Sequence, residues 1–215
     1  MKKILALVLA LMLLGTAALA AKTVAPDTAP IDPANVPDGM YPATFEAEKI
    51  TVNEDGTATV EVTFAAEEAY DIVDVDQLEV GDTIVSDGEE IVVEKIEHIG
   101  NCVFINEGYI EGGVTLANYP DMNGWIAVTY DSVPLYANIG TATMTISKDV
   151  VYHDTAEVEM GLNDKEINVT GVEAMLEGMH FHESDNTDFK PFVQTETTVT
   201  VENGVITEIN HRYVQ

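Results

Sequence analysis

The sequence has little cysteine, few basic residues and only one long apolar run. Cys102 is the single cysteine among 215 residues, so no disulfide can form within the chain. It falls in an apolar, strand-like run from Asn101 to Ile105, where cysteine is usually a small buried side chain rather than a nucleophile. Stability must therefore come from a hydrophobic core, for which a 46% hydrophobic composition is sufficient at this length.

Basic residues are outnumbered by acidic ones. Nine Lys and Arg face 38 Asp and Glu, which gives a formal charge of −29. Such a field repels phosphates and anionic lipid surfaces, so we expect no nucleic acid partner and no electrostatic membrane role. Two interpretations of the acidity stay open: a solvated surface that keeps the protein soluble, and a surface that binds divalent cations.

The apolar run lies at the N-terminus and predicts a secretory signal peptide over residues 1–20. Lys2 and Lys3 precede the apolar stretch Ile4 to Leu14, and Ala18-Leu19-Ala20 has the small-x-small pattern of a cleavage site. Cleavage near Ala20 removes two of the nine basic residues and none of the 38 acidic ones, which makes the charge −31. We expect a secreted, extracellular protein without a membrane span, since no second run of this kind follows.

The next segment, residues 21–39, predicts a Pro-rich linker. Pro26, Pro30, Pro33 and Pro37 recur with few large side chains between them, which favours an extended and mobile chain. The pattern of residues 40–215 predicts a single β domain.

Alternating polar and apolar residues predict strands through most of that domain. Ala58 to Phe64 alternates with period two, and the Asp87-Gly88 turn joins Thr83–Ser86 to a second strand, Ile91–Ile99. The alternation fails at Glu94-Lys95, which predicts a β-bulge or a strong coil of the strand there. The sequence ends in a predicted hairpin of Thr195–Val201 and Val205–Tyr213.

One short α-helix is predicted over about 171–179. Thr170-Gly171-Val172-Glu173 fits a capping box, and the apolar residues that follow have helical spacing and form one stripe for packing on a sheet: Val172, Met175, Leu176 and Met179. The fold class predicted is mostly β, an antiparallel partly open barrel or sandwich with this helix packed against it.

Two resemblances bear on the family. Leu78 to Ile84, followed by Asp87-Gly88 and Val92 to Ile96, looks like the L-x-x-G-D-x-I hairpin of hedgehog/intein (Hint) domains. Those domains need an initial Cys or Ser nucleophile and a terminal His-Asn pair. Neither is present, so the resemblance implies no self-processing.

The second resemblance spans most of the mature chain. The segments LEVGDTIV, INEGYIEGG and VENGVITEINHRYV, which begin at Leu78, Ile105 and Val201, resemble uncharacterised exported β proteins of Gram-positive anaerobes. This resemblance implies export and a single domain, and it implies no activity.

Aromatic residues near carboxylates form the first candidate site: Tyr109, Glu111, Trp125 and Tyr130. Aromatic faces stack on sugars or peptide groups while carboxylates accept hydrogen bonds, so the group suits a glycan, peptide or protein ligand. The alternative is that these rings fill the β core.

His180, His182, Asp185 and Asp188 form the second candidate site. In a strand, His-x-His places two imidazoles on one face, which suits zinc with a carboxylate as third ligand, and the oxygen-rich Asp185 to Asp188 stretch suits calcium. The alternative is a polar surface loop without a cofactor.

These patterns favour an exported, non-catalytic extracellular binding module. The alternatives are a metal- or carboxylate-dependent hydrolase and a structural module of the cell envelope. The sequence contains no G-x-S-x-G, G-x-G-x-x-G, Walker A or paired C-x-x-C motif.

A metal at the His180/His182 loop is directly testable. If the loop binds zinc or calcium, the purified protein contains that metal, and a chelator lowers its melting temperature because bound metal stabilises the folded state. Metal-free protein with a melting temperature indifferent to chelator would remove the site.

Overall fold

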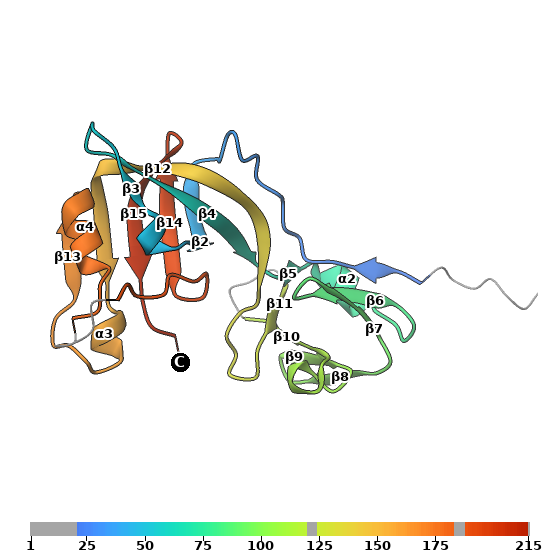
Figure 1. The fold of residues 1–215 in the computed structure, drawn as a ribbon. Helices are drawn as coiled ribbons and strands as arrows, with labels where there is room; N and C mark the ends of the chain where they lie inside the picture. The colour runs from blue at the N-terminus through green and yellow to red at the C-terminus, as the bar shows by residue number, and fades with distance from the viewer. Residues whose placement is uncertain (1–20, 120–123, 183–187, 215) are drawn as a thin grey trace, which may run out of the picture.

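The computed structural model describes residues 21–119, 124–182 and 188–214, and these fold mostly into β-strands, as predicted. The predicted signal peptide therefore lies outside the described residues. Figure 1 shows two lobes joined by a pair of long strands. None of the described helices has the length and apolar character needed to cross a membrane.

The larger lobe, here the barrel lobe, is built on a seven-stranded sheet of order β13-β12-β15-β14-β2-β4-β3. Because β12 also pairs with β4, five of these strands close into a ring, which confirms the predicted barrel. Most pairings are antiparallel, and β12 with β15 is parallel. The strands are β2 (Gly39–Thr44), β3 (Thr51–Val52), β4 (Ala58–Glu67), β12 (Tyr136–Asp154), β13 (Ile167–Thr170), β14 (Thr197–Glu202) and β15 (Val205–His211).

The length and curvature of β12 close the ring. Its first half, Tyr136 to Ile146, pairs with β4, and its second half, Thr145 to Asp154, pairs with β15. The register shifts at Asn138/Gly140, where Gly140 has a φ of 149° and a Cβ would lie 2.6 Å from the Ile31 side chain. Glycine therefore permits both the irregularity and the close contact at this point.

The helix α4 (Val172–Gly178) covers the barrel core and confirms the predicted helix. Val172, Met175 and Met179 are buried in the main apolar cluster, and Leu176 packs against it. The predicted capping box is wrong, because Thr170 ends β13 and Gly171, with a φ of 97°, occupies the N-cap without a side-chain hydrogen bond. A second short helix, α3 (Ala156–Glu159), follows β12, and a 3-10 turn, η1 (Ala47–Lys49), precedes β3.

The smaller lobe, here the hairpin lobe, holds two sheets around a second apolar cluster. One sheet has the order β1-β6-β7 and the other β5-β11-β10-β9-β8. The elements are β1 (Thr23–Val24), β5 (Ala69–Tyr70), α2 (Ile72–Asp76), β6 (Thr83–Ser86), β7 (Glu89–Val92), β8 (Ile96–Ile99), β9 (Cys102–Ile105), η2 (Tyr109–Glu111), β10 (Val114–Ala117) and β11 (Trp125–Val128).

The β6–β7 hairpin turns at Asp87-Gly88 as predicted, with φ of 51° and 74° at these two residues. The predicted bulge at Glu94-Lys95 is wrong, because the chain leaves the first sheet after Val92 and enters the second at Ile96. The alternation fails there because the two strands belong to different sheets.

The side chain of Asn106 stabilises the segment that passes from the first sheet to the second. Its Oδ1 accepts the N–H groups of Glu94 and Lys95 at 2.8 and 3.1 Å, and its Nδ2 donates to the Val92 carbonyl at 2.7 Å. Backbone groups that leave a ladder need such partners. Asn106 itself has a φ of 51°, a conformation that Asn tolerates better than most residues.

The Pro-rich segment contacts both lobes. Val24 of β1 is buried in the hairpin lobe, where β1 pairs with β6. Further along, Ile31 donates its N–H to the Ile139 carbonyl at 2.8 Å, and Val36 is buried in the barrel core. The segment expected as a linker ahead of the domain thus contributes to both cores, while the single-domain assignment stays a prediction.

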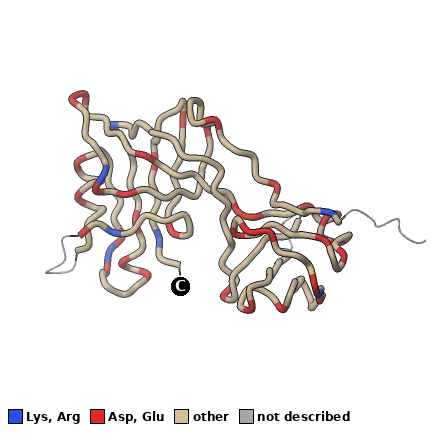
Figure 2. Tube along the Cα trace, turned by 45° about the vertical axis from the view of Figure 1, so that its right-hand side comes forward, with Lys and Arg blue, Asp and Glu red and all other residues tan. Residues whose placement is uncertain are grey.

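Acidic residues are distributed over both lobes (Figure 2). Among the described lysines, Lys22, Lys49 and Lys95 form exposed or half-exposed pairs with Asp74, Glu46 and Glu107. Pairs of this kind contribute about 0–1 kcal/mol each, so the cores rather than surface charges stabilise the fold.

Replacing Asn106 by Gly tests the crossover. Gly accepts the φ of 51°, so the change removes only the three side-chain hydrogen bonds, and we expect the free energy of unfolding to fall by about 2 kcal/mol. Asp87→Gly is the matched control, because Asp87 has the same φ and an exposed side chain. Urea unfolding that shows equal effects for the two variants would contradict this role.

Candidate functional site

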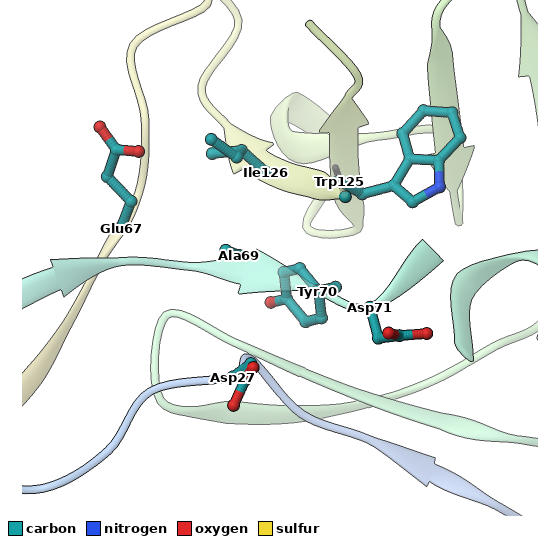
Figure 3. A pocket seen from close by; sticks show the side chains of 8 residues that line it. Asp27, Glu67, Ala69, Tyr70, Asp71, Trp125 and Ile126 are labelled. Atoms are coloured by element: carbon teal, nitrogen blue, oxygen red, sulfur yellow. The ribbon is translucent and has the colours of Figure 1, made fainter. Parts of the chain in front are cut away.

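A pocket of about 330 Å³ opens beside β5 and β11 in the hairpin lobe. Figure 3 shows its side chains gathered around the short strand β5. Its lining combines three carboxylates with two aromatic rings and small or apolar residues: Asp27, Glu67, Ala69, Tyr70, Asp71, Gly124, Trp125 and Ile126. This volume lies in the usual range for small-ligand pockets.

Each carboxylate of this acidic pocket is placed by a different element. Glu67 ends β4, and Asp71 is the N-cap of α2, where it accepts the N–H groups of Val73 and Asp74. Asp27 belongs to the N-terminal segment, which its own N–H ties to the Ala69 carbonyl at 2.7 Å. Within the described residues, none of the three forms an ion pair, so the pocket presents uncompensated negative charge.

Two aromatic residues of the lining, Tyr70 and Trp125, bury their rings in the apolar cluster of the hairpin lobe. Trp125 of β11 lies opposite Tyr70 of β5 in the ladder. Trp125 is only 8% exposed, and its indole Nε1 has no hydrogen-bond partner among the described residues. The Tyr70 hydroxyl donates to the Val85 carbonyl at 2.7 Å, which fixes the ring.

Glu68 is a buried carboxylate beside the Tyr70 hydroxyl, and the sequence analysis did not single it out. Its carboxylate is 1% exposed and accepts the Ser86 hydroxyl at 2.7 Å, the Asp87 N–H at 2.8 Å and the Tyr70 hydroxyl at 3.2 Å. Burial, and then the neighbouring Glu68 charge, raise the pKa of Tyr70. The phenol therefore stays protonated and remains a donor.

The structure separates the predicted aromatic site residues. Tyr109 and Glu111 lie in η2 and are exposed, and Tyr130 is 74% exposed after the end of β11. The register of β9, β10 and β11 places these three at one end of the sheet. Trp125 begins β11 at the opposite end and is buried, so the four do not form one patch, and binding by Tyr109, Glu111 and Tyr130 stays a prediction.

The predicted metal residues make different contacts, and a metal site in this loop stays a prediction. His180 stacks on Phe189 with ring centroids 3.9 Å apart, whereas His182 Nδ1 lies 3.1 Å from Glu157 Oε1. Asp188 is exposed, and Asp185 lies outside the described residues. Across residues 21–119, 124–182 and 188–214, no three His, Cys, Asp or Glu side chains are grouped to hold a metal ion.

His182 instead borders a buried charged cluster of the barrel lobe. Lys190, with its side chain 1% exposed, lies 2.8 Å from Asp154 Oδ2 and 3.1 Å from Glu157 Oε1. The Tyr152 hydroxyl also donates to Asp154 Oδ2. His211 Nδ1 is 3.2 Å from the same oxygen, at an angle that makes no hydrogen bond.

These contacts decide the charges of the cluster. Burial acts to raise the pKa of Asp154, but His211, Lys190 and Tyr152 together hold it well below its ordinary value. Burial opposes ionisation of Glu157 too, and hydrogen bonds from His182, Lys190 and Asn163 lower its pKa. Burial and the Asp154 charge raise the pKa of Tyr152. In this form the cluster is an ion-paired network with a neutral phenol.

Cys102 is half-buried in β9. Its Sγ lies 3.9 Å from Asn101 Oδ1.

Comparison of the chain with protein-family models, with curated proteins and with solved structures gives no match. The resemblances to Hint domains and to exported proteins of Gram-positive anaerobes therefore stay predictions.

Trp125, the only tryptophan, reports on the acidic pocket directly. Because the ring is buried, we expect its fluorescence to peak at a shorter wavelength in the folded protein than in urea, with weak quenching by acrylamide. Emission and quenching typical of a water-exposed indole in the folded protein would contradict this placement.

Proposed function

We propose that the protein is an exported, non-catalytic binding module whose acidic pocket binds a Lys- or Arg-bearing peptide or protein segment. The observation that carries the proposal is that three carboxylates from different elements, those of Asp27, Glu67 and Asp71, line one pocket beside β5. Carboxylates attract an ammonium or guanidinium group through charge-assisted hydrogen bonds.

The charge of the whole chain supports the same ligand class. A formal charge of −29 attracts cationic partners and speeds their encounter with the protein. The net charge attracts any cation, whereas the pocket carboxylates would form specific hydrogen bonds with a bound ammonium or guanidinium group. A neutral glycan uses the rings and hydroxyl acceptors, but it gains nothing from the uncompensated charge.

Glu67→Gln and Asp27→Asn test the pocket by removing charge while keeping shape. With a short lysine peptide as probe, we expect each change to cost about 1 kcal/mol, roughly a fivefold rise in Kd measured by calorimetry. Added salt should weaken binding to the unmodified protein, since the pairs are partly exposed.

Glu61→Gln is the matched control, because Glu61 lies on the same strand β4, is exposed and does not line the pocket. The control should bind like the unmodified protein, and a peptide with acetylated lysines should bind weakly. The proposal fails if Glu61→Gln and Glu67→Gln have equal effects, or if acetylated peptide or a neutral oligosaccharide binds as tightly as the lysine peptide.

A further inference from the structure

The buried cluster around Lys190 places an amine against a carboxyl group away from water. The side chains of Lys190 and Asp154 are each 1% exposed. By contrast, those of the Lys22–Asp74 pair are 29% and 58% exposed. Water solvates the charges of the exposed pair, whereas the buried pair is shielded from solvent.

The groups around this pair are those that amide formation requires. Lys190 Nζ, a nucleophile once deprotonated, is 2.8 Å from Asp154 Oδ2, the oxygen bonded to the electrophilic Cγ. Glu157 Oε1 lies 3.1 Å from the same Nζ and is placed to accept a proton. The Ala156 N–H donates to Asp154 Oδ1 at 2.8 Å, where negative charge develops during attack on Cγ.

We propose that Lys190 and Asp154 condense to an intramolecular isopeptide bond, with Glu157 as the proton carrier. One ammonium proton first passes to Asp154, which leaves a neutral amine beside a neutral carboxyl group. Nζ then forms a bond to Cγ, the Cγ–Oδ2 bond breaks, and Oδ2 leaves as water. The two protons that the ammonium group loses leave with that water, so the ion pair becomes a neutral amide and no other reactant is needed.

The roles of the two carboxyl oxygens follow from their contacts. Oδ1, held by the Ala156 N–H, becomes the amide oxygen. Oδ2 accepts hydrogen bonds from the Tyr152 hydroxyl and from Lys190 Nζ, so donors surround the oxygen that must be protonated to leave. A pocket of about 130 Å³, lined by Lys190, His211 and mainly apolar neighbours, gives the water a place to go.

The fold supplies the driving force. The cluster holds the reacting groups together at a high effective concentration, which offsets the cost of condensation in a dilute aqueous medium. Condensation also removes two charges whose burial is costly. The product links the end of β12 to the segment before β14, a covalent brace in a chain whose single cysteine forms no internal disulfide. This inference is independent of the proposed ligand.

Mass spectrometry of the purified full-length protein tests the bond. We expect an intact mass lower than the chain mass by one water molecule, and a tryptic digest in which peptide 149–165 is joined to peptide 166–212. Trypsin leaves Lys190 uncut in either case, because Pro191 follows it. A chain mass without the loss, with the two peptides separate, overturns the proposal and leaves an ion pair.

Controls separate this bond from other losses of water. Asp-Gly sequences such as Asp55-Gly56 form succinimides of the same mass loss, but mild base rehydrates these and leaves an amide intact. Lys190→Arg keeps the charge without the nucleophile and should yield separate peptides, whereas Lys22→Arg should leave the joined peptide unchanged. The wild-type peptide map decides the case even if Lys190→Arg does not fold.

Glu157→Gln tests the proton carrier. It should lower the rate of bond formation about a hundredfold and leave most of the purified chain unjoined. Complete joining in this variant would overturn the role of Glu157.

Discussion

The pairing of β4 with β12 is the constraint on which the rest of the structure depends. Its ladder runs from Tyr136↔Glu67 to Ile146↔Ala58, so it both closes the barrel and carries two strands toward the hairpin lobe. Glu67 ends β4, Glu68 turns into the hairpin lobe and Ala69 begins β5. The acidic pocket lies at this junction because the continuous segment from Glu67 to Asp71 supplies half of its lining residues. The N-terminal segment adds Asp27 from the other side of β5.

Carboxylates are accommodated in two ways. Most of the described Asp and Glu side chains are exposed or partly exposed, so water solvates them and salt screens their mutual repulsion. The buried ones need specific partners: Glu68 accepts three donors without a cation, whereas Asp154 and Glu157 share Lys190. The pocket falls between these cases, since its three carboxylates are accessible but line one hollow beside β5. That difference in partners supports both proposals, an external cationic ligand for the pocket and a reaction within the chain for the buried cluster.

Patterns over a few neighbouring residues correctly predicted the strands, turns and helix that depend mainly on those residues. Alternation marked β4, the Asp87-Gly88 pair marked a turn that needs two positive φ angles, and one apolar stripe marked α4. The wrong predictions concern places where a pattern in the sequence reflects contacts with distant residues. At Glu94-Lys95 the broken alternation reflects a change of sheet rather than a bulge, and Asn106, twelve positions after Glu94, satisfies the freed backbone groups. No spacing rule connects those positions.

The sequence by itself determined the β class, the acidic charge and the absence of an internal disulfide, because composition and short-range periodicity suffice for each. Only the tertiary structure decided which side chains meet. It separated Trp125 from Tyr109 and Tyr130 by placing them at opposite ends of one sheet. It also placed Asp27 and Glu67, from distant segments, in the lining of one pocket. Likewise it brought Lys190 to Asp154. Strand register and the path between sheets control these distances, and both arise from long-range pairing that a linear pattern does not encode.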